Sequence, residues 1–233
     1  MHEHPNAWDP EYLGITLLHE EAKQLEGVLP RLFGYHLAII GDSLFSPYAK
    51  SSLIQHRVLV TRQDAYADSC TLVRGQYNQL PIASESLDVV LLPHTLETVK
   101  QPESVLRDAV RVLRPNGYLI ITGANPYSWI GVRYELERTF NRGSVANRWP
   151  SVKECEKWCT WLDMEVDRVD YFHMCLPLLK STKFGKKPPL SNSLSLQYGG
   201  YMVLAVKREA GVTPIRASWN RRKASIGTEV PIS

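Results

Sequence analysis

The sequence predicts an α/β protein with a doubly wound sheet. Short apolar runs that suit buried strands alternate with segments whose apolar residues recur at helical spacing. This alternation is typical of parallel βαβ units, whose crossovers are right-handed in nearly all known cases. With 233 residues, 44% hydrophobic and 22% charged, the chain is large enough to bury the core of one such domain.

The first half of the chain supplies one helix and four candidate strands. The helix begins at Asp9-Pro10 and keeps apolar residues at helical spacing as far as Leu29, so we expect it to cover one face of the sheet. The strands are short apolar or β-branched runs, and the first of them closes in the turn Gly41-Asp42-Ser43. They are expected at residues 36–40, 57–61, 71–74 and 87–92.

A second helix and a fifth strand follow. Residues 102–113 place their apolar side chains on one helical face, with Pro102 in the first turn, where its missing N–H costs nothing. The turn Pro115-Asn116-Gly117 then leads into a buried strand at 118–122.

The last part of the chain adds a helix and two strands. Ser151 and Glu154 form a capping-box pattern that predicts a helix start. Further strands are expected at 164–172 and 201–207, and the Lys-, Pro-, Ser- and Gly-rich segment 180–200 between them is predicted to be a loop. We expect one domain over residues 1–208 and a disordered basic tail over residues 209–233.

Composition narrows the class of protein. No run approaches the roughly 20 apolar residues that span a bilayer, and the start of the chain is polar, so a cytoplasmic protein is expected. The formal charge of +3 equals that of the segment after Val212, which carries four basic residues and one acidic residue. The cysteines lack C-x-x-C spacing, which favours reduced core thiols over a metal site or disulfides. They are Cys70, Cys155, Cys159 and Cys175.

One segment, from Gln79 to Asn125, carries a series of motifs. They are Leu80-Pro81-Ile82, Asp88 near a strand start, Leu96-Glu97-Thr98-Val99, Gln101-Pro102, and the turn Arg111 to Gly117. This series resembles class I S-adenosylmethionine (SAM)-dependent methyltransferases of the type 11 kind. With Phe33 to His36 before the first strand and Asn125 to Ser128 after the fifth, it is also similar to a bacterial subgroup of small methyltransferase-domain proteins.

The resemblance implies a fold and a cofactor. The fold is a Rossmann-like sheet of seven strands, mostly parallel with an antiparallel last strand. SAM would lie at the carboxyl ends of the strands near the switch point, where reversed strand order leaves a crevice. The residues that the resemblance places around SAM are Gly41, Asp42, Ser43, Gln76, Leu80, His94 and Thr95.

The chain departs from the family pattern at three places. Of the family's G-x-G-x-G only Gly41 is kept, with Ser43 and Phe45 at the other glycine positions. Arg62 stands near the end of the second strand, where an acidic residue normally accepts bonds from ribose hydroxyls. Gln76 replaces the acidic residue near the adenine amine, and its amide oxygen can still accept a hydrogen bond.

The acceptor side of the reaction is less defined. His94 is the candidate catalytic residue because a histidine there can take a proton near neutral pH; a turn histidine that only ends the strand is the alternative. Glu97 is expected to be a solvated helix-entry residue. The resemblance assigns acceptor choice to Tyr127 to Arg148 and to the 180–200 loop; Tyr127 is expected to line the acceptor pocket or to pack in an aromatic core.

Two functions from different classes are expected to compete. The first is SAM-dependent methylation of a small-molecule acceptor rather than a macromolecule; the second is a non-catalytic binding or regulatory protein of the same fold, which Phe45, Arg62 and Gln76 favour. Nucleic-acid binding through the tail and nucleobase amino methylation are disfavoured, the latter because Asn125-Pro126-Tyr127 follows the wrong strand. A nicotinamide dehydrogenase is disfavoured because G-x-G-x-x-G is absent.

Overall fold

The structure is a computed structural model that describes residues 10–63, 69–128, 131–132, 149–174 and 198–208. Seven strands form one sheet in the order β3-β2-β1-β4-β5-β7-β6. The strands are β1 His36–Ile40, β2 His56–Thr61, β3 Thr71–Arg74, β4 Leu87–Pro93, β5 Leu113–Ala124, β6 Met164–Met174 and β7 Tyr198–Lys207. The α-helices that flank them are α1 Pro10–Val28, α2 Pro102–Val112 and α4 Val152–Trp161.

Strand direction confirms the predicted fold class. β1 pairs with β2 and β4 in parallel, and β2–β3 and β4–β5 are parallel as well. β7 is antiparallel to both of its neighbours, β5 and β6. β7, the last strand in sequence, thus lies between β5 and β6, and β6 forms one edge of the sheet.

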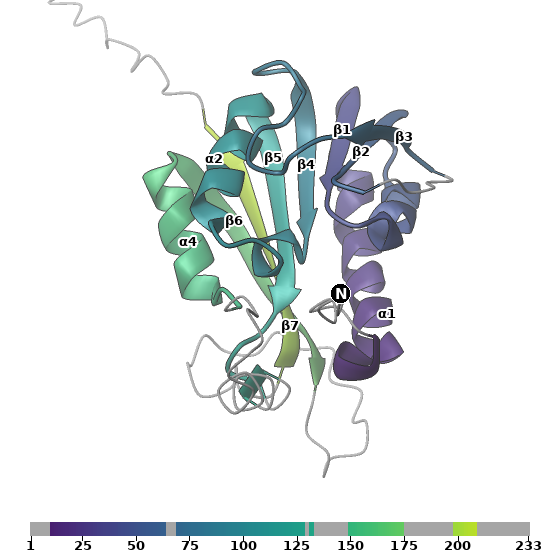
Figure 1. Cartoon of the computed structure of the whole chain (residues 1–233), viewed down its shortest axis with the longest axis vertical. Coiled ribbons are helices and arrows are strands. Elements are labelled where there is room, and N and C mark those ends of the chain that lie inside the picture. The colour runs from purple at the N-terminus through teal and green to yellow at the C-terminus, as the bar shows by residue number, and fades with distance from the viewer. Residues whose placement is uncertain (1–9, 64–68, 129–130, 133–148, 175–197, 209–233) are drawn as a thin grey trace, which may run out of the picture.

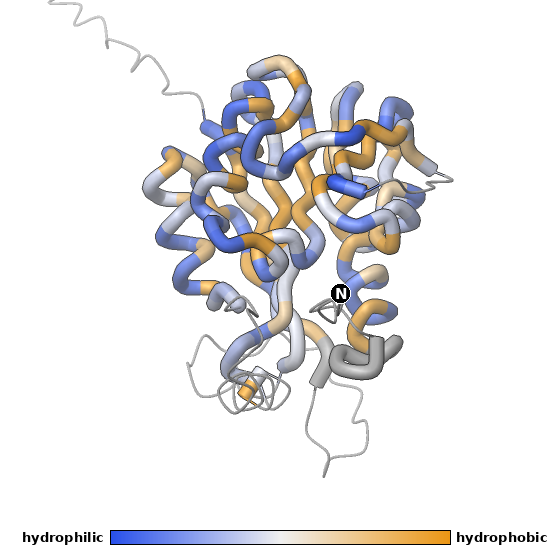
Figure 2. Tube along the Cα trace, viewed as in Figure 1, coloured by the Kyte–Doolittle hydropathy of each residue, from blue (hydrophilic) through white to orange (hydrophobic). Residues whose placement is uncertain are grey.

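Helices cover both faces of the sheet, α1 on one and α2 with α4 on the other (Figure 1). The strands alternate their side chains between two apolar clusters, as the period of two requires. On β5, Leu119 and Ile121 join the cluster on the α2 and α4 side, whereas Ile120 and Ala124 join the α1 side. Figure 2 shows that the central strands are mostly hydrophobic, whereas the helices beside them alternate hydrophilic and hydrophobic residues.

The predicted elements agree closely with the structure, with differences at a few ends. The capping box of Ser151 and Glu154 is present at the start of α4. β7 begins at Tyr198, so the last residues of the expected 180–200 loop are strand, and the earlier ones lie outside the described residues. The expected turn at 115–117 is an irregular start of β5, where Asn116 has a φ of 61° and the register against β4 shifts.

The turn after β1 continues into a 3₁₀ helix, η2, at Ser43–Ser51. Asp42 caps it, because its Oδ1 accepts a hydrogen bond from the Leu44 N–H at 3.0 Å. Pro47 lies inside this segment, and a proline there removes a backbone donor that an α-helix would need.

Among the described residues, no helix has the length and apolar character required to cross a bilayer. The predicted tail at 209–233 lies outside the described residues, and the single-domain assignment stays a prediction.

Candidate functional site

The candidate site lies where strand order reverses, at the carboxyl ends of β1 and β4. Gly41 directly follows β1 and donates its N–H to the Val60 carbonyl at 3.0 Å. A Cβ added to Gly41 would lie 3.2 Å from Thr95 Oγ1, tighter than an ordinary contact. The glycine therefore lets the turn after β4 approach the turn after β1 closely.

Thr95 fastens these two turns together. Its side chain is 1% exposed, and its hydroxyl donates a hydrogen bond to the Ile40 carbonyl. The preceding residue, His94, adopts a left-handed conformation with φ 53° and donates its backbone N–H to the Thr122 carbonyl at 2.9 Å. This conformation is uncommon for residues other than glycine, so it marks a constrained position.

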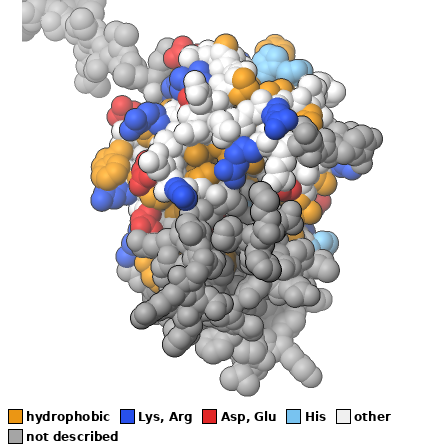
Figure 3. Space-filling model, in the orientation of Figure 1, with side chains coloured by type: hydrophobic (Ala, Val, Ile, Leu, Met, Phe, Trp, Pro, Cys, Tyr) orange, Lys and Arg blue, Asp and Glu red, His pale blue; other side chains and the backbone are white. Residues whose placement is uncertain are grey.

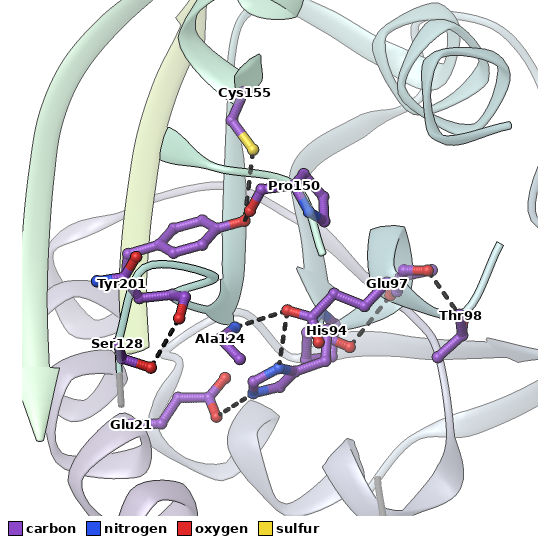
Figure 4. A network of polar contacts seen from close by, with 12 residues as sticks. Glu21, His94, Glu97, Thr98, Ala124, Ser128, Pro150, Cys155 and Tyr201 are labelled. Carbon is purple, nitrogen blue, oxygen red and sulfur yellow. Dashed lines mark hydrogen bonds and ion pairs between the residues drawn. The ribbon is translucent and has the colours of Figure 1, made fainter. Parts of the chain in front are cut away.

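His94 is the centre of a buried ionisable cluster (Figure 4). Its Nε2 lies 2.8 Å from Glu21 Oε2 of α1, and its Nδ1 lies 3.4 Å from Glu97 Oε1. Tyr48 donates its hydroxyl to the same Glu21 oxygen at 3.0 Å. We call Glu21, His94 and Glu97 the buried triad, because the side chain of each is at most 1% exposed.

Glu97 is not the solvated helix-entry residue that the sequence predicted. Its Oε1 accepts a hydrogen bond from the Ala124 N–H at 2.6 Å, which joins the turn after β4 to the end of β5. Gly123 makes room for this contact, since a Cβ there would lie 2.8 Å from Glu97 Oε1. Burial raises the pKa of Glu97 well above its ordinary value, the Ala124 hydrogen bond opposes this, and the nearby Glu21 adds to it.

Several buried oxygens of the triad and its surroundings have no hydrogen-bond partner among the described residues. They include Glu21 Oε1, Glu97 Oε2 and the hydroxyl of Thr122. A buried polar atom without a partner costs about 1–3 kcal/mol, so each such atom requires an explanation. A carboxylate oxygen that is held in place and unpaired can accept a proton from a bound molecule.

The aromatic residue in the first turn packs inward. Phe45 is 2% exposed and belongs to the apolar cluster on the α1 side. Its ring stacks on the His94 imidazole and lies at a tilt against Tyr48. Asp42 is exposed on the same turn, and Ser43 is half-buried.

The residues that follow the carboxyl ends of β2 and β3 include exposed polar side chains. Gln76 is exposed, and Leu80 is buried with its N–H donated to Asp108 Oδ2. The guanidinium of Arg62 lies 4.5 Å from the centre of the Tyr77 ring, a cation–π contact. Arg62 thus contacts an aromatic residue at the place where the family has an acid.

The predicted site residues form two groups. Gly41, His94 and Thr95 come together at the ends of β1 and β4, with side chains or backbone already bonded within the protein. Asp42 and Gln76 are exposed at the carboxyl ends of β1 and β3.

Sequence reasoning missed Glu21, because one acidic residue on an amphipathic helix gives no signal of its own. Tyr127 is 52% exposed, which excludes the expected aromatic core packing.

A family model described as a methyltransferase domain matches residues 48–121, from η2 to β5. The fold of this chain is that of class I SAM-dependent methyltransferases, and the matched residues lie within it. The match covers strands on both sides of the switch point, namely β2 and β3 on one side and β4 and most of β5 on the other.

Solved structures support this fold. A SAM-dependent methyltransferase from Thermotoga maritima, described as a possible histamine N-methyltransferase, has a TM-score of 0.64 at 20% identity over 85% of this chain and 92% of that chain. A SAM-dependent methyltransferase from Archaeoglobus fulgidus has a TM-score of 0.60 at 17% identity over 85% of this chain and 97% of that chain. At these identities the likeness shows the fold alone.

Two sequence relatives accompany these structures. The uncharacterized protein YafS of Escherichia coli K12 is 29% identical over 170 residues, which are 73% of this chain and 69% of YafS. A demethylmenaquinone methyltransferase of Chlamydia pneumoniae is 22% identical over 125 residues, which are 54% of either chain. The second match therefore spans about half of that enzyme.

The residues at the strand ends fit SAM by the chemistry of their donors and acceptors. The exposed Asp42 carboxylate can accept hydrogen bonds from ribose hydroxyls, and the exposed Gln76 amide can pair with the adenine amine. The Phe45 ring is directed into the α1-side core rather than displayed on the surface of the turn. The charge of Arg62, near the end of β2, opposes the family pattern.

Proposed function

We propose that the domain methylates a small-molecule acceptor and that Glu21 receives the proton that the acceptor gives up. SAM supplies a methyl group already activated on a sulfonium, so the chain has to position the reactants and accept a proton. The observation that carries the proposal is the unpaired Oε1 of Glu21, buried in the α1-side layer at the carboxyl ends of β4 and β5.

The proposed cofactor contacts follow from exposure and chemistry. Asp42 and Gln76 would bind the ribose and the adenine, as their exposed oxygens allow. Gly41 and Thr95 would shape the turn on which the cofactor rests, since their contact fixes the ends of β1 and β4. Ser43, Leu80 and the His94 backbone would complete the set.

The proton step assigns separate roles within the buried triad. The acceptor's N–H or O–H proton would move to Glu21 Oε1, and the lone pair left on the acceptor atom would bond to the methyl carbon as the carbon–sulfur bond breaks with its electrons on sulfur. Glu21 Oε2 stays bonded to His94 Nε2 and to the Tyr48 hydroxyl, which hold the carboxylate in one orientation. His94 is then a positioning residue, because both of its ring nitrogens face carboxylates of the protein.

A small acceptor is supported by two observations. The relative named demethylmenaquinone methyltransferase acts, by its name, on a small molecule. On the face shown in Figure 3, the described Lys and Arg side chains are scattered rather than gathered in one patch, which does not favour a nucleic-acid surface on that face. The second candidate function is a non-catalytic protein of this fold, which Arg62 in place of an acid favours.

Transfer of labelled methyl groups tests the proposal. The full chain is incubated with methyl-labelled SAM and either the low-molecular-weight or the macromolecular fraction of a cell extract. Label is expected in the small molecules, and Glu21→Gln is expected to reduce it by roughly 10²-fold or more, the size of a general-base contribution. Glu26→Gln, an exposed change on the same helix, is the matched control. Label in macromolecules alone, or equal transfer by Glu21→Gln, would contradict the proposal.

A further inference from the structure

Two histidines meet at the amino ends of β1 and β2, at the opposite end of these strands from the candidate active site. His36 and His56 are the first residues of β1 and β2 and are direct partners in the parallel register. Their Nδ1 atoms are 3.0 Å apart, their ring planes are 85° apart, and both residues are exposed. The methyltransferase site uses neither residue, since it lies at the carboxyl ends of the same strands.

The spacing of the two nitrogens suits one metal ion. Histidine nitrogens bind such ions at about 2.0–2.1 Å, so a pair 3.0 Å apart subtends an angle of about 95° at the metal. That angle is close to the cis angle of a square-planar or tetragonal site, which copper(II) and nickel(II) prefer. A tetrahedral ion would separate the nitrogens by about 3.3 Å. We propose that His36 and His56 form a two-histidine site for Cu²⁺ or Ni²⁺.

The backbone holds both ligands in place before the metal arrives. The His36 N–H donates to Asp88 Oδ2 at 2.9 Å, and the strand ladder continues from His36–His56 through four further pairs. Asp88 accepts hydrogen bonds from the backbone N–H groups of Tyr35 and His36 and forms an ion pair with Arg114, so it does not serve as a ligand. The described residues contain no group of three or more metal-ligating side chains, so water completes the coordination.

Proton balance sets one condition for binding. Two neutral imidazoles in Nδ1 contact share one hydrogen, which one ring donates to the other. The metal needs both Nδ1 lone pairs, so that hydrogen moves to the Nε2 of its own ring as the other neutral tautomer. A histidine that is protonated on both nitrogens releases one proton to water, so binding weakens as the pH falls.

Copper titration of the untagged full chain tests the site. We expect one Cu²⁺ with two nitrogen ligands in the electron paramagnetic resonance spectrum and a rise in Tm. His36→Ala or His56→Ala is expected to raise the Kd for Cu²⁺ by roughly 10²-fold, because a chelate becomes a single ligand. His19→Ala, at an exposed position on α1, is the control and should bind as the wild type does. Unchanged binding by the His36→Ala/His56→Ala double variant would overturn the proposal.

Discussion

The ring of Phe45 stacks on the imidazole of His94, with ring centroids 5.6 Å apart and 25° between the ring planes. Phe45 stands at the third glycine position of the family's first turn, where a glycine would allow close packing of helix and strand. In this chain a buried side chain fills that place and joins the turn after β1 to the turn after β4. The aromatic residue thus contributes to the core and orients a member of the buried triad.

Phe45→Ala should therefore weaken the fold. Truncating a fully buried phenylalanine costs about 3–5 kcal/mol, which urea unfolding can measure. Phe45→Leu keeps most of the apolar volume and should cost clearly less. A loss below about 1 kcal/mol for Phe45→Ala would show that the ring is not part of the core.

Glu97→Gln should remove a pH dependence of stability. The pKa of Glu97 is raised well above 4.5 in the folded protein, so folding binds its proton more tightly. This contribution is complete below the ordinary pKa and is lost as the pH rises through the raised one. The free energy of unfolding of the wild type should thus fall with rising pH above 4.5 relative to Glu97→Gln.

The amide that Glu97→Gln introduces can still accept the Ala124 hydrogen bond, so the comparison isolates the charge. Glu103→Gln, at an exposed position in the first turn of α2, is the control and should keep the wild-type slope. Parallel slopes for Glu97→Gln and the wild type between about pH 5 and pH 9 would contradict the burial of an ionisable Glu97, since linkage fixes the slope by proton uptake.

The thiols of α4 should resist alkylation in the native protein. Burial raises the pKa of Cys155 to about 12 and that of Cys159 to about 11, so few thiolates form at about pH 8. Both should be protected from iodoacetamide until denaturant is added, as peptide mass spectrometry would detect. Rapid native modification of Cys155 would mean that α4 separates from the sheet.

The exposed residues at the strand ends should control cofactor affinity. Asp42→Ser keeps a side chain that can cap η2 but removes the carboxylate, and it should weaken S-adenosylhomocysteine binding by about 1.5–3 kcal/mol. Gln76→Ala should cost about 0.5–1.5 kcal/mol. Gln55→Ala, an exposed change at the far edge of the sheet, is the control. Affinities equal to the wild type in both variants would place the adenosine elsewhere.

The fold was largely predictable from sequence because its signals are local. The apolar run His36–Ile40, the amphipathic face of α2 and the capping box at Ser151 each specify an element without reference to distant residues. The strand order and the antiparallel β7 were available only through the resemblance. Pairing between distant strands leaves no local trace in a single sequence.

The site was predictable only in part, because its contacts are non-local. The family pattern identified His94, but its partner Glu21 lies 73 residues earlier on a different element. The burial of Glu97 depends on the Ala124 N–H and on the missing side chain at Gly123, which only the folded sheet brings together. Likewise, Phe45 looks like an obstacle in the sequence, and its inward packing depends on α1 and the turn after β4.

Calorimetric titration of the full chain with S-adenosylhomocysteine tests most directly whether this domain holds a cofactor at the ends of β1 and β4. We expect one saturable site, which Gly41→Trp abolishes because the indole would enter the contact with Thr95. Circular dichroism and thermal unfolding must show that this variant is folded. The absence of any binding heat from the wild type at about 1 mM ligand, a concentration that fills sites of even modest affinity, would contradict the account.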